Sequence, residues 1–390
     1  MNGAGKKVVV VTNSSSYEPR AEWVGELFKQ QGAQVLWVET DFIHREKVKK
    51  VRSAPDHMYI DTVPYRKNLS VRRLYSQYDF ARKAEKILEK EQADMVYMIL
   101  PANSLAAAGD RLKRKMNRAI LVFDILDLWP ESLGGKKLQK LWPFQCWRRL
   151  RDDHLKAADL VITECHYFQK FINAKQKKTA VVYWPKEVPE GWKMEAPENE
   201  APESPAVIHF AYLGSINNII DIDGIVNFLE ITGKMTPVFL HVVGDGENRG
   251  LFEEKLKSKG IKAEFYGAVY EEAVKAEIFS RCMFGINMMK PGVCVGLTMK
   301  SIDYFCYGLP LVNNIPGDTW ELVKQEQIGI NYRQDAALKC AQELLALAQS
   351  DRLKEIKYKM QSLYMKLFTQ EAAENVIRER VFPLLEGGPK

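Results

Sequence analysis

The sequence predicts an α/β protein built from two doubly wound domains. Its 390 residues exceed the length of one ordinary domain. Short apolar runs alternate with segments of helical apolar spacing along both halves, which is typical of parallel sheets joined by helical crossovers. Between the halves lies a segment, residues 185–205, with five prolines and six glutamates, which indicates a linker. These three observations favour two domains over one.

The first half, residues 1–184, begins with a run of four valines at 8–11. This run is too short for a signal peptide and indicates a buried strand. Helical apolar spacing follows at 21–31 and again at 80–92. The strands expected in this half are the apolar runs at 8–12, 35–38, 95–100, 120–125, 160–163 and 181–184.

The second half repeats this rhythm over residues 206–352. The strands expected there are 208–213, 239–243, 264–266, 284–288, 311–313 and 329–332. The remaining segment, residues 353–390, has a helical pattern with one apolar face. It either caps the second domain alone or also packs back on the first.

The charge and the cysteines narrow the class of protein. The net charge is +6, and residues 111–156 hold twelve Lys and Arg against five Asp and Glu, which favours phosphate, anionic lipid or nucleic acid as a partner. The six cysteines form no C-x-x-C pair, which argues against zinc and a redox dithiol and fits a reducing cytoplasm. No apolar stretch approaches the ~18 residues of a spanning helix, so we expect any membrane contact to be peripheral.

Glycines follow three successive strands of the second half. Gly214 and Ser215 follow the first strand, Gly244 and Gly246 the second, and Gly267 the third. Backbone N–H groups at the carboxyl ends of parallel strands can face a phosphate. The pattern therefore predicts a ligand along one sheet edge, and tight-turn chemistry is the alternative.

The segment Thr298–Pro310 carries a further signal. Thr298 suits a helix N-cap and Gly308 a helix stop, so a short helix is expected between them. Lys300 and Asp303 would lie one turn apart near the helix N-terminus, where phosphate binding is favoured. The lysine can meet a diphosphate and the acid can accept ribose hydroxyls. The alternative is a surface ion pair between the two.

The segment resembles the P-x-K-x-x-E-Y-x-A-x-G-x-P element of retaining GT-B glycosyltransferases, in which it holds the nucleotide of the donor sugar. The matching residues are Lys300, Asp303, Tyr304, Gly308 and Pro310, with aspartate in place of the usual glutamate. Residues 127–132, Asp-Leu-Trp-Pro-Glu-Ser, resemble an element of bacterial members that assemble surface polysaccharides. The resemblance implies two Rossmann-like domains facing a cleft, with the acceptor on the first and a nucleoside-diphosphate sugar on the second.

The chain also departs from this family pattern. Val295 stands where the family commonly has a second acid that contacts the sugar, and the basic pair expected after Gly214 is missing. Donor phosphate contacts would then come from Lys300, the backbone of Gly292 and Val293, and Lys290. The donor-site residues that the resemblance implies are Gly214, Ser215, Gly244, Gly246, Gly292, Val293, Lys300, Asp303 and Thr319.

The acceptor side is expected at strand ends of the first half. Asp127 would orient or deprotonate an acceptor hydroxyl, or else cap the turn at Trp129–Pro130. The loop 13–17 offers small hydrogen-bonding groups, and capping of the next helix is the alternative. His44 and His166 either assist catalysis or are structural.

Residues 136–151 interleave basic groups with tryptophan and phenylalanine. Such a surface suits an anionic membrane interface and would also suit single-stranded nucleic acid. A helix pair with core aromatics and solvated charges is the alternative. A polyprenyl-linked acceptor would be consistent with the membrane interpretation, which would place the protein at the inner face of the cell membrane.

We therefore predict a glycosyltransferase that moves a sugar from a nucleoside-diphosphate sugar to a hydroxyl of a glycan or lipid-linked glycan. The catalytic groups expected are Asp127 and Lys300, with no metal, no cofactor besides the donor substrate and no nucleic-acid partner. The rival is a non-catalytic scaffold of the same fold that binds a nucleotide sugar or a partner enzyme, because Val295 and the missing basic pair weaken the donor site. A second rival, an epimerase, would need acids and histidines in the cleft, and the second half supplies only His209 and His241.

Overall fold

The computed structural model describes residues 5–116, 118–133, 139–172, 179–194 and 206–387. Its internal contacts divide the chain into two compact units, unit 1 (Met1–Tyr183 and Ala373–Lys390) and unit 2 (Trp184–Ala372). Residues 195–205 of the predicted linker and 136–138 of the predicted basic run lie outside the described residues.

Unit 1 is a seven-stranded parallel sheet with the order β5-β2-β1-β6-β7-β8-β9. The order reverses beside β1, which pairs with both β2 and β6, so the unit is doubly wound. Valines fill β1 and are buried on both faces, as expected for a central parallel strand. The strands are β1 (Lys7–Thr12), β2 (Gln34–Thr40), β5 (His57–Ile60), β6 (Met95–Leu100), β7 (Ile120–Ile125), β8 (Leu160–Thr163) and β9 (Thr179–Val181).

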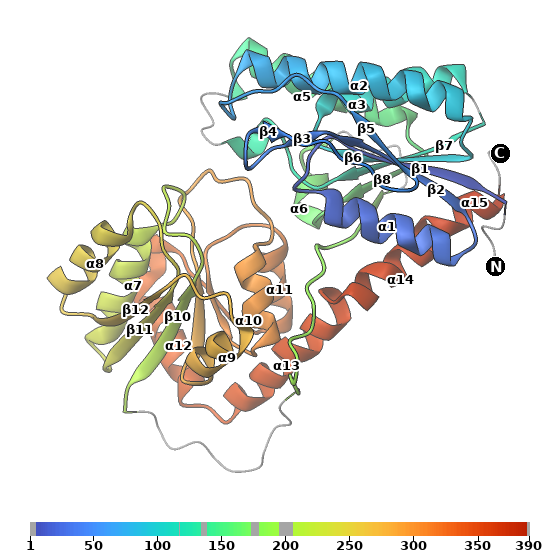
Figure 1. Cartoon of the computed structure of the whole chain (residues 1–390). Coiled ribbons are helices and arrows are strands. Elements are labelled where there is room, and N and C mark those ends of the chain that lie inside the picture. The colour runs from blue at the N-terminus through green and yellow to red at the C-terminus, as the bar shows by residue number, and fades with distance from the viewer. Residues whose placement is uncertain (1–4, 117, 134–138, 173–178, 195–205, 388–390) are drawn as a thin grey trace. The chain divides into compact units, whose positions relative to one another are not determined.

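Helices cover both faces of the unit 1 sheet. Figure 1 shows α2, α3 and α5 on one face and α1 with α15 on the other. A small antiparallel hairpin, β3 (Phe42–Ile43) and β4 (Val48–Lys49), follows β2. The helices are α1 (Glu18–Gln30), α2 (Val71–Glu91), α3 (Asn103–Lys115), α5 (Trp142–Asp152), α6 (His166–Gln169) and α15 (Phe382–Gly387).

Unit 2 is a six-stranded parallel sheet with the order β12-β11-β10-β13-β14-β15. The order reverses between β10 and β13, so this unit is doubly wound too. Its core includes Phe210, Phe228 and Phe284, which are fully buried. The strands are β10 (Ile208–Leu213), β11 (Val238–Val243), β12 (Lys262–Gly267), β13 (Phe284–Asn287), β14 (Leu311–Asn313) and β15 (Gly329–Asn331).

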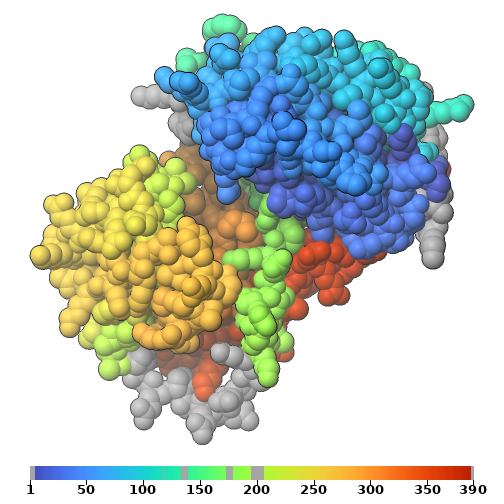
Figure 2. Space-filling view, viewed as in Figure 1, coloured from blue at the N-terminus to red at the C-terminus, as the bar shows by residue number. Residues whose placement is uncertain are grey.

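The helices of unit 2 pack in groups. Helix α7 packs with α8 and α12, and α10 packs with α13. The chain from α8 to α9, yellow to orange in Figure 2, forms part of the exposed surface of this unit. The helices are α7 (Ile222–Gly233), α8 (Arg249–Ser258), α9 (Glu272–Ser280), α10 (Met299–Cys306), α11 (Asp318–Glu326), α12 (Ala337–Ala348) and α13 (Arg352–Leu367).

The predicted C-terminal segment 353–390 is shared by the two units. Helix α13 belongs to unit 2, whereas the chain from Ala373 onward, through most of α14 (Gln370–Arg380) and through α15, belongs to unit 1. There the ring of Phe382 packs against Phe28 of α1 at 5.3 Å between centroids. Among the described helices, none combines the length and the apolar character needed to cross a bilayer.

Candidate functional site

Three glycine turns lie together at the carboxyl ends of β10, β11 and β12. The amide of Gly214 donates to the carbonyl oxygen of Val243 at 2.9 Å, and the amide of Gly244 donates to that of Gly267 at 2.7 Å. A Cβ atom on Gly244 would lie only 2.0 Å from the carbonyl oxygen of Gly214. The close approach of two backbones therefore requires glycine at position 244 and supports the tight-turn interpretation there.

The same packing accounts for Gly246, because a Cβ atom there would lie 2.6 Å from the carbonyl oxygen of Ile216. Gly214 differs, since the nearest atom to its Cβ position is Cδ of Lys300 at 4.0 Å, and its φ of 115° suits glycine. Ser215 is exposed. Gly214 and Ser215 thus remain open to a ligand, as does Gly267, which has no atom within 4 Å of its Cβ position.

Lys300 lies in the first turn of α10 and is buried. Its Nζ atom has no hydrogen-bond partner among the described residues, and it lies 4.9 Å from the ring centroid of Tyr212. Burial lowers the pKa of Lys300 from 10.5 to about 7. A buried ammonium group without a counter-charge is costly, so this position favours an anion brought by a ligand.

Asp303 is buried one turn further along α10 and does not form the surface ion pair considered above. Its Oδ1 atom accepts hydrogen bonds from Lys186 and, at 3.3 Å, from Lys275. Burial alone would lower the pKa of Lys275, but Asp303 and Glu272 raise it above its usual range. Two lysines therefore hold the carboxylate in place, and both bonds end on the same oxygen.

The loop before α10 carries the remaining predicted donor contacts. Gly292 is exposed with a φ of 93°, and the amide of Val293 donates to the carbonyl oxygen of Lys290 at 3.5 Å. Thr319 is fully buried, and its amide and hydroxyl both donate to the carbonyl oxygen of Gly296, at 2.9 and 3.0 Å. Thr319 thus holds this loop in place through Gly296 and does not itself face solvent.

An asparagine ladder, Asn287, Asn313 and Asn331, is the feature that the sequence analysis missed. The amide of Asn287 donates to Oδ1 of Asn313 at 2.9 Å, and that of Asn313 donates to Oδ1 of Asn331 at 3.0 Å. Asn287 also accepts from the Thr298 hydroxyl at 3.1 Å and donates to the Ser301 hydroxyl at 2.9 Å. The ladder fixes the first turn of α10, which carries Lys300. The signal was present in the sequence, because each of these three strands ends in asparagine.

In unit 1, Asp127 follows β7 and is largely enclosed. Its Oδ2 atom accepts the indole N–H of Trp129, which is the turn-capping contact expected as the alternative to catalysis. Burial raises the pKa of Asp127, while Ser132 and Trp129 lower it by hydrogen bonding. Arg73 of α2 lies with its guanidinium 3.8 Å from the ring centroid of Trp129. Asp127 therefore belongs to a cluster with an arginine and an aromatic ring.

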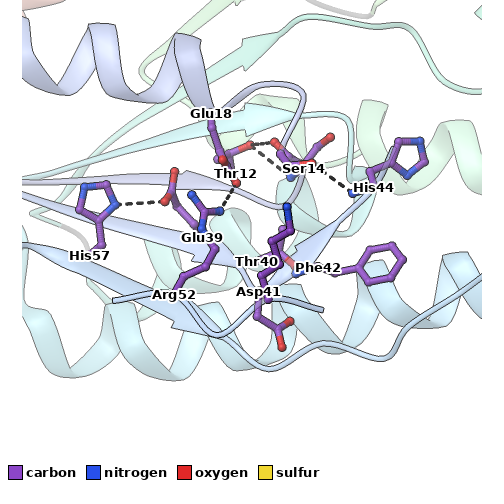
Figure 3. Close-up of polar contacts among 12 residues, drawn as sticks. Thr12, Ser14, Glu18, Glu39, Thr40, Asp41, Phe42, His44, Arg52 and His57 are labelled. Carbon is purple, nitrogen blue, oxygen red and sulfur yellow. Dashed lines mark hydrogen bonds and ion pairs between the residues drawn. The ribbon is translucent and has the colours of Figure 1, made fainter. Parts of the chain in front are cut away.

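The loop 13–17 joins a second group at the same sheet edge. The amide of His44 donates to the hydroxyl of Ser15 at 3.1 Å, and Thr12 and Ser14 exchange weak bonds (Figure 3). No side-chain bond caps α1 at Tyr17, so the serines do not supply the expected helix cap. His166 packs its ring edge-on against Tyr183 at 6.3 Å.

The described part of the predicted basic run, residues 139–151, lies mostly in α5, and its residues differ in exposure. Trp147 is half-buried and packs edge-on against Trp129. The fully buried Arg151 pairs with Glu131 at 2.8 Å and belongs to the interior. Trp142 is 75% exposed, and Leu141 is 50% exposed. The exposed positions are Lys140, Leu141, Trp142, Pro143, Cys146, Arg148, Arg149 and Leu150.

Two doubly wound units in one chain, with glycine turns at the strand ends of the second, match the GT-B fold. No model of a known protein family and no curated protein sequence matches the chain.

Solved structures do match over nearly its whole length, and they establish the fold alone. A lipopolysaccharide outer core galactosyltransferase, WaaB, is 14% identical with a TM-score of 0.67, covering 97% of this chain and 99% of its own. A glycosyltransferase from Rickettsia africae is 13% identical with a TM-score of 0.63, covering 99% and 100%. Anabaena HepE in complex with UDP is 13% identical with a TM-score of 0.64, covering 97% and 100%.

Proposed function

We propose that this protein is a glycosyltransferase that moves a sugar from a nucleoside-diphosphate sugar to a hydroxyl of a glycan or lipid-linked glycan. The observation that carries the proposal is the buried Nζ of Lys300, which has no hydrogen-bond partner among the described residues and lies beside the open Gly214 turn. A diphosphate would supply the missing counter-charge. The likeness in fold to HepE, whose structures hold UDP and UDP-glucose, supports the same donor class.

In the proposed reaction, the leaving diphosphate gains negative charge as the sugar departs. Lys300 and the positive end of the α10 dipole would stabilise this charge, so we propose that the enzyme needs no metal. Asp303, fixed through Oδ1, would accept a ribose hydroxyl with its other oxygen. Unit 2 is thus the proposed donor-binding unit, and retention of the anomeric configuration follows from the family resemblance.

Unit 1 is the proposed acceptor-binding unit, in which Asp127 would orient an acceptor hydroxyl. Burial raises the pKa of Asp127, which makes its carboxylate a stronger base than an exposed aspartate. The resemblance of residues 127–132 to proteins that assemble surface polysaccharides supports a cell-surface glycan as the product. Asp127 also caps its own turn, so its loss is expected to disturb Trp129 as well.

The donor site is tested by nucleotide binding to the full chain. Lys300→Met is expected to weaken UDP or the preferred nucleotide at least tenfold, because the diphosphate loses its buried cation. The matched control is Lys257→Met, which removes an exposed lysine of α8 in the same unit. Calorimetry after a thermal-shift screen of nucleotides measures both. Equal affinity in wild type and Lys300→Met would contradict the proposed site.

A second candidate is a non-catalytic scaffold that binds a nucleotide sugar. It is favoured by Val295, which leaves the sugar without the acid that the family commonly places there. A donor-hydrolysis and transfer assay separates the two functions. Nucleotide binding without turnover of any nucleotide sugar would favour the scaffold over the enzyme.

We also propose that α5 makes a peripheral contact with an anionic membrane. Trp142 and Leu141 are exposed beside the exposed Arg148 and Arg149, a combination that suits lipid headgroups. Co-sedimentation with vesicles containing phosphatidylserine is expected to fall in Trp142→Ala. Equal sedimentation of the variant and the wild type would rule out this contact.

A further inference from the structure

Two basic side chains converge on one buried tyrosine ring in unit 1. The Nζ atom of Lys47 lies 5.0 Å from the ring centroid of Tyr65, and the guanidinium carbon of Arg73 lies 5.6 Å from it. His44 accepts at Nδ1 from the Tyr65 hydroxyl at 2.6 Å. Lys47 and His44 come from the β3–β4 hairpin and Arg73 from α2, so the fold brings these residues together from separate segments.

Arg73 is 8% exposed and incompletely paired. One terminal nitrogen donates to the carbonyl oxygen of Asn68 at 2.9 Å, but Nε has no hydrogen-bond partner among the described residues. Within that part of the chain, no carboxylate forms an ion pair with Arg73 or Lys47. Asp127 attracts Arg73 from a distance while it accepts the indole N–H of Trp129. A buried guanidinium group with an unpaired Nε can be completed by an oxyanion.

The titration of the neighbouring groups agrees with an excess of positive charge. Burial, Arg73 and Lys47, followed by Arg45, lower the pKa of His44 to about 4, so the imidazole is neutral. Burial and Arg73 lower the pKa of Lys47 as well. Lys47 already donates to Oδ1 of Asn68 and, at 3.3 Å, to Nδ1 of His44, but neither acceptor carries a negative charge. Both Lys47 and Arg73 would therefore gain from a negative charge beside them.

We propose that Lys47 and Arg73 bind an oxyanion. Tyr65 and the neutral His44 contact these basic side chains and fix their positions. The planar guanidinium suits a phosphate or a carboxylate, with Nε and one terminal nitrogen forming a fork. The wall of the site is the indole of Trp129, on which Arg73 stacks. This step rests on the proposed function. It implies that the acceptor carries a phosphate or a carboxylate near the hydroxyl that is glycosylated.

The test uses the full chain in the Lys300→Met background, so that binding at the donor site is already weakened. Calorimetric titrations are made with inorganic pyrophosphate, glucuronate and, as the neutral ligand, glucose. We expect pyrophosphate or glucuronate to bind and glucose not to bind. Binding of pyrophosphate alone indicates a phosphorylated acceptor, and binding of glucuronate alone indicates an acidic sugar.

Two further substitutions in this background locate the site. Lys47→Gln and Arg73→Gln are each expected to weaken the anion at least tenfold. Lys86→Gln, which removes an exposed lysine of α2, is the matched control and is expected to leave binding unchanged. Lys47 is partly exposed, so its variant reports on the site even where Arg73→Gln perturbs the fold. Failure of both anions to bind, or equal binding in Lys47→Gln and the parent, would overturn the proposal.

The same variants separate this proposal from the proposed function. In an otherwise wild-type chain, Lys47→Gln is expected to leave UDP affinity unchanged, because UDP is assigned to unit 2. If UDP does not bind the wild type while the anion binds at Lys47 and Arg73, the proposed donor chemistry fails and the anion site stands.

Discussion

At the scale of single residues, the most consequential feature is a positive charge placed where the free protein does not stabilise it. Lys300 and Arg73 each have a buried nitrogen that lacks a partner among the described residues. Most buried polar groups in folded proteins are paired, and exceptions concentrate where a ligand completes them. Buried atoms without a partner also occur on Arg20, Glu39, Asp79, Asn103 and Asp124. Among these charged groups, Arg20 pairs with Asp124, Glu39 with His57 and Asp79 with Arg82. Lys300 and Arg73 have no such pair in the described part of the chain, which agrees with a substrate that carries negative charge.

Lys300→Met is expected to stabilise the free protein. The folded pKa of Lys300 is about 7 against 10.5 for an ordinary lysine, so between these pH values the unfolded chain binds a proton that the folded chain lacks. The wild type therefore gains stability as pH rises from 7 toward 10, and the variant lacks this gain. At pH 7 the variant is expected to be more stable by about 2 kcal/mol or more.

Urea unfolding at pH 7, 8 and 9 measures this difference. The advantage of Lys300→Met is expected to shrink as pH rises, whereas the exposed control Lys257→Met stays close to the wild type at each pH. A variant that is less stable than the wild type at pH 7 would show that Lys300 has a counter-charge in solution.

At the scale of elements, the turns that follow neighbouring strands of unit 2 contact one another directly through their backbones. Gly244 lies against Gly214, and the asparagine ladder ties three neighbouring strands to the first turn of α10. Both features keep loops rigid at the edge where the donor is proposed to bind. A site on such loops is positioned before the ligand arrives.

Gly244→Ala is expected to destabilise the protein by about 3 kcal/mol or more, since the new Cβ atom would lie 2.0 Å from a backbone oxygen. Gly267→Ala is the matched comparison. Gly267 has a φ of 72° but nothing within 4 Å of its Cβ position, so only the left-handed backbone is penalised, by about 1 kcal/mol. Chemical denaturation measures the free energy of unfolding of both variants. Similar losses in the two would contradict the prediction and would mean that the Gly214 turn shifts to make room for the new Cβ atom.

The elements themselves were largely readable from the sequence. The predicted strands 95–100, 120–125, 160–163, 208–213 and 311–313 coincide with β6, β7, β8, β10 and β14. The predicted strand 181–184 was wrong by a few residues, because β9 covers Thr179–Val181. Strand β5 was missed because this edge strand is short and only its last residue is fully buried, so no apolar run marks it.

The candidate sites were less readable, because their contacts join residues far apart in sequence. Lys300 and Asp303 lie on a helix with the predicted start at Thr298. The lysines that hold Asp303 are 117 and 28 residues away from it, and no local pattern relates them. The same holds for Arg73, whose meaning depends on the burial of Tyr65 and Trp129 beside it.

At the scale of the whole molecule, unit 1 is assembled from two distant parts of the chain. Residues from Ala373 onward supply Ile377, Val381 and Leu385 to its interior, and Trp23 donates to Glu374 at 3.3 Å. Helical periodicity showed that the terminal segment has an apolar face, with Val381 among its members. It left open which surface covers that face, since periodicity carries no information about the partner.

Phe382→Ala is expected to lower the stability of unit 1 by about 3 kcal/mol, because the phenyl ring fills space against Phe28 and is 8% exposed. Glu379→Ala, an exposed position of α14, is the control and is expected to change stability by less than about 0.5 kcal/mol. Native-state hydrogen exchange resolves the two units separately. If Phe382→Ala lowered amide protection mainly in unit 2, this result would contradict the assignment of the segment to unit 1.

The divided origin of unit 1 also sets an order for protein synthesis. The ribosome completes residues 184–372, and with them all of unit 2, before it adds the helical turns that begin at Ala373. Domains usually fold from the N-terminus as they emerge, but here the first domain to begin is the last to be finished. Until the final turns arrive, the side of α1 that carries Phe28 stays uncovered on the nascent chain, so this is the stage at which we expect a chaperone to be needed.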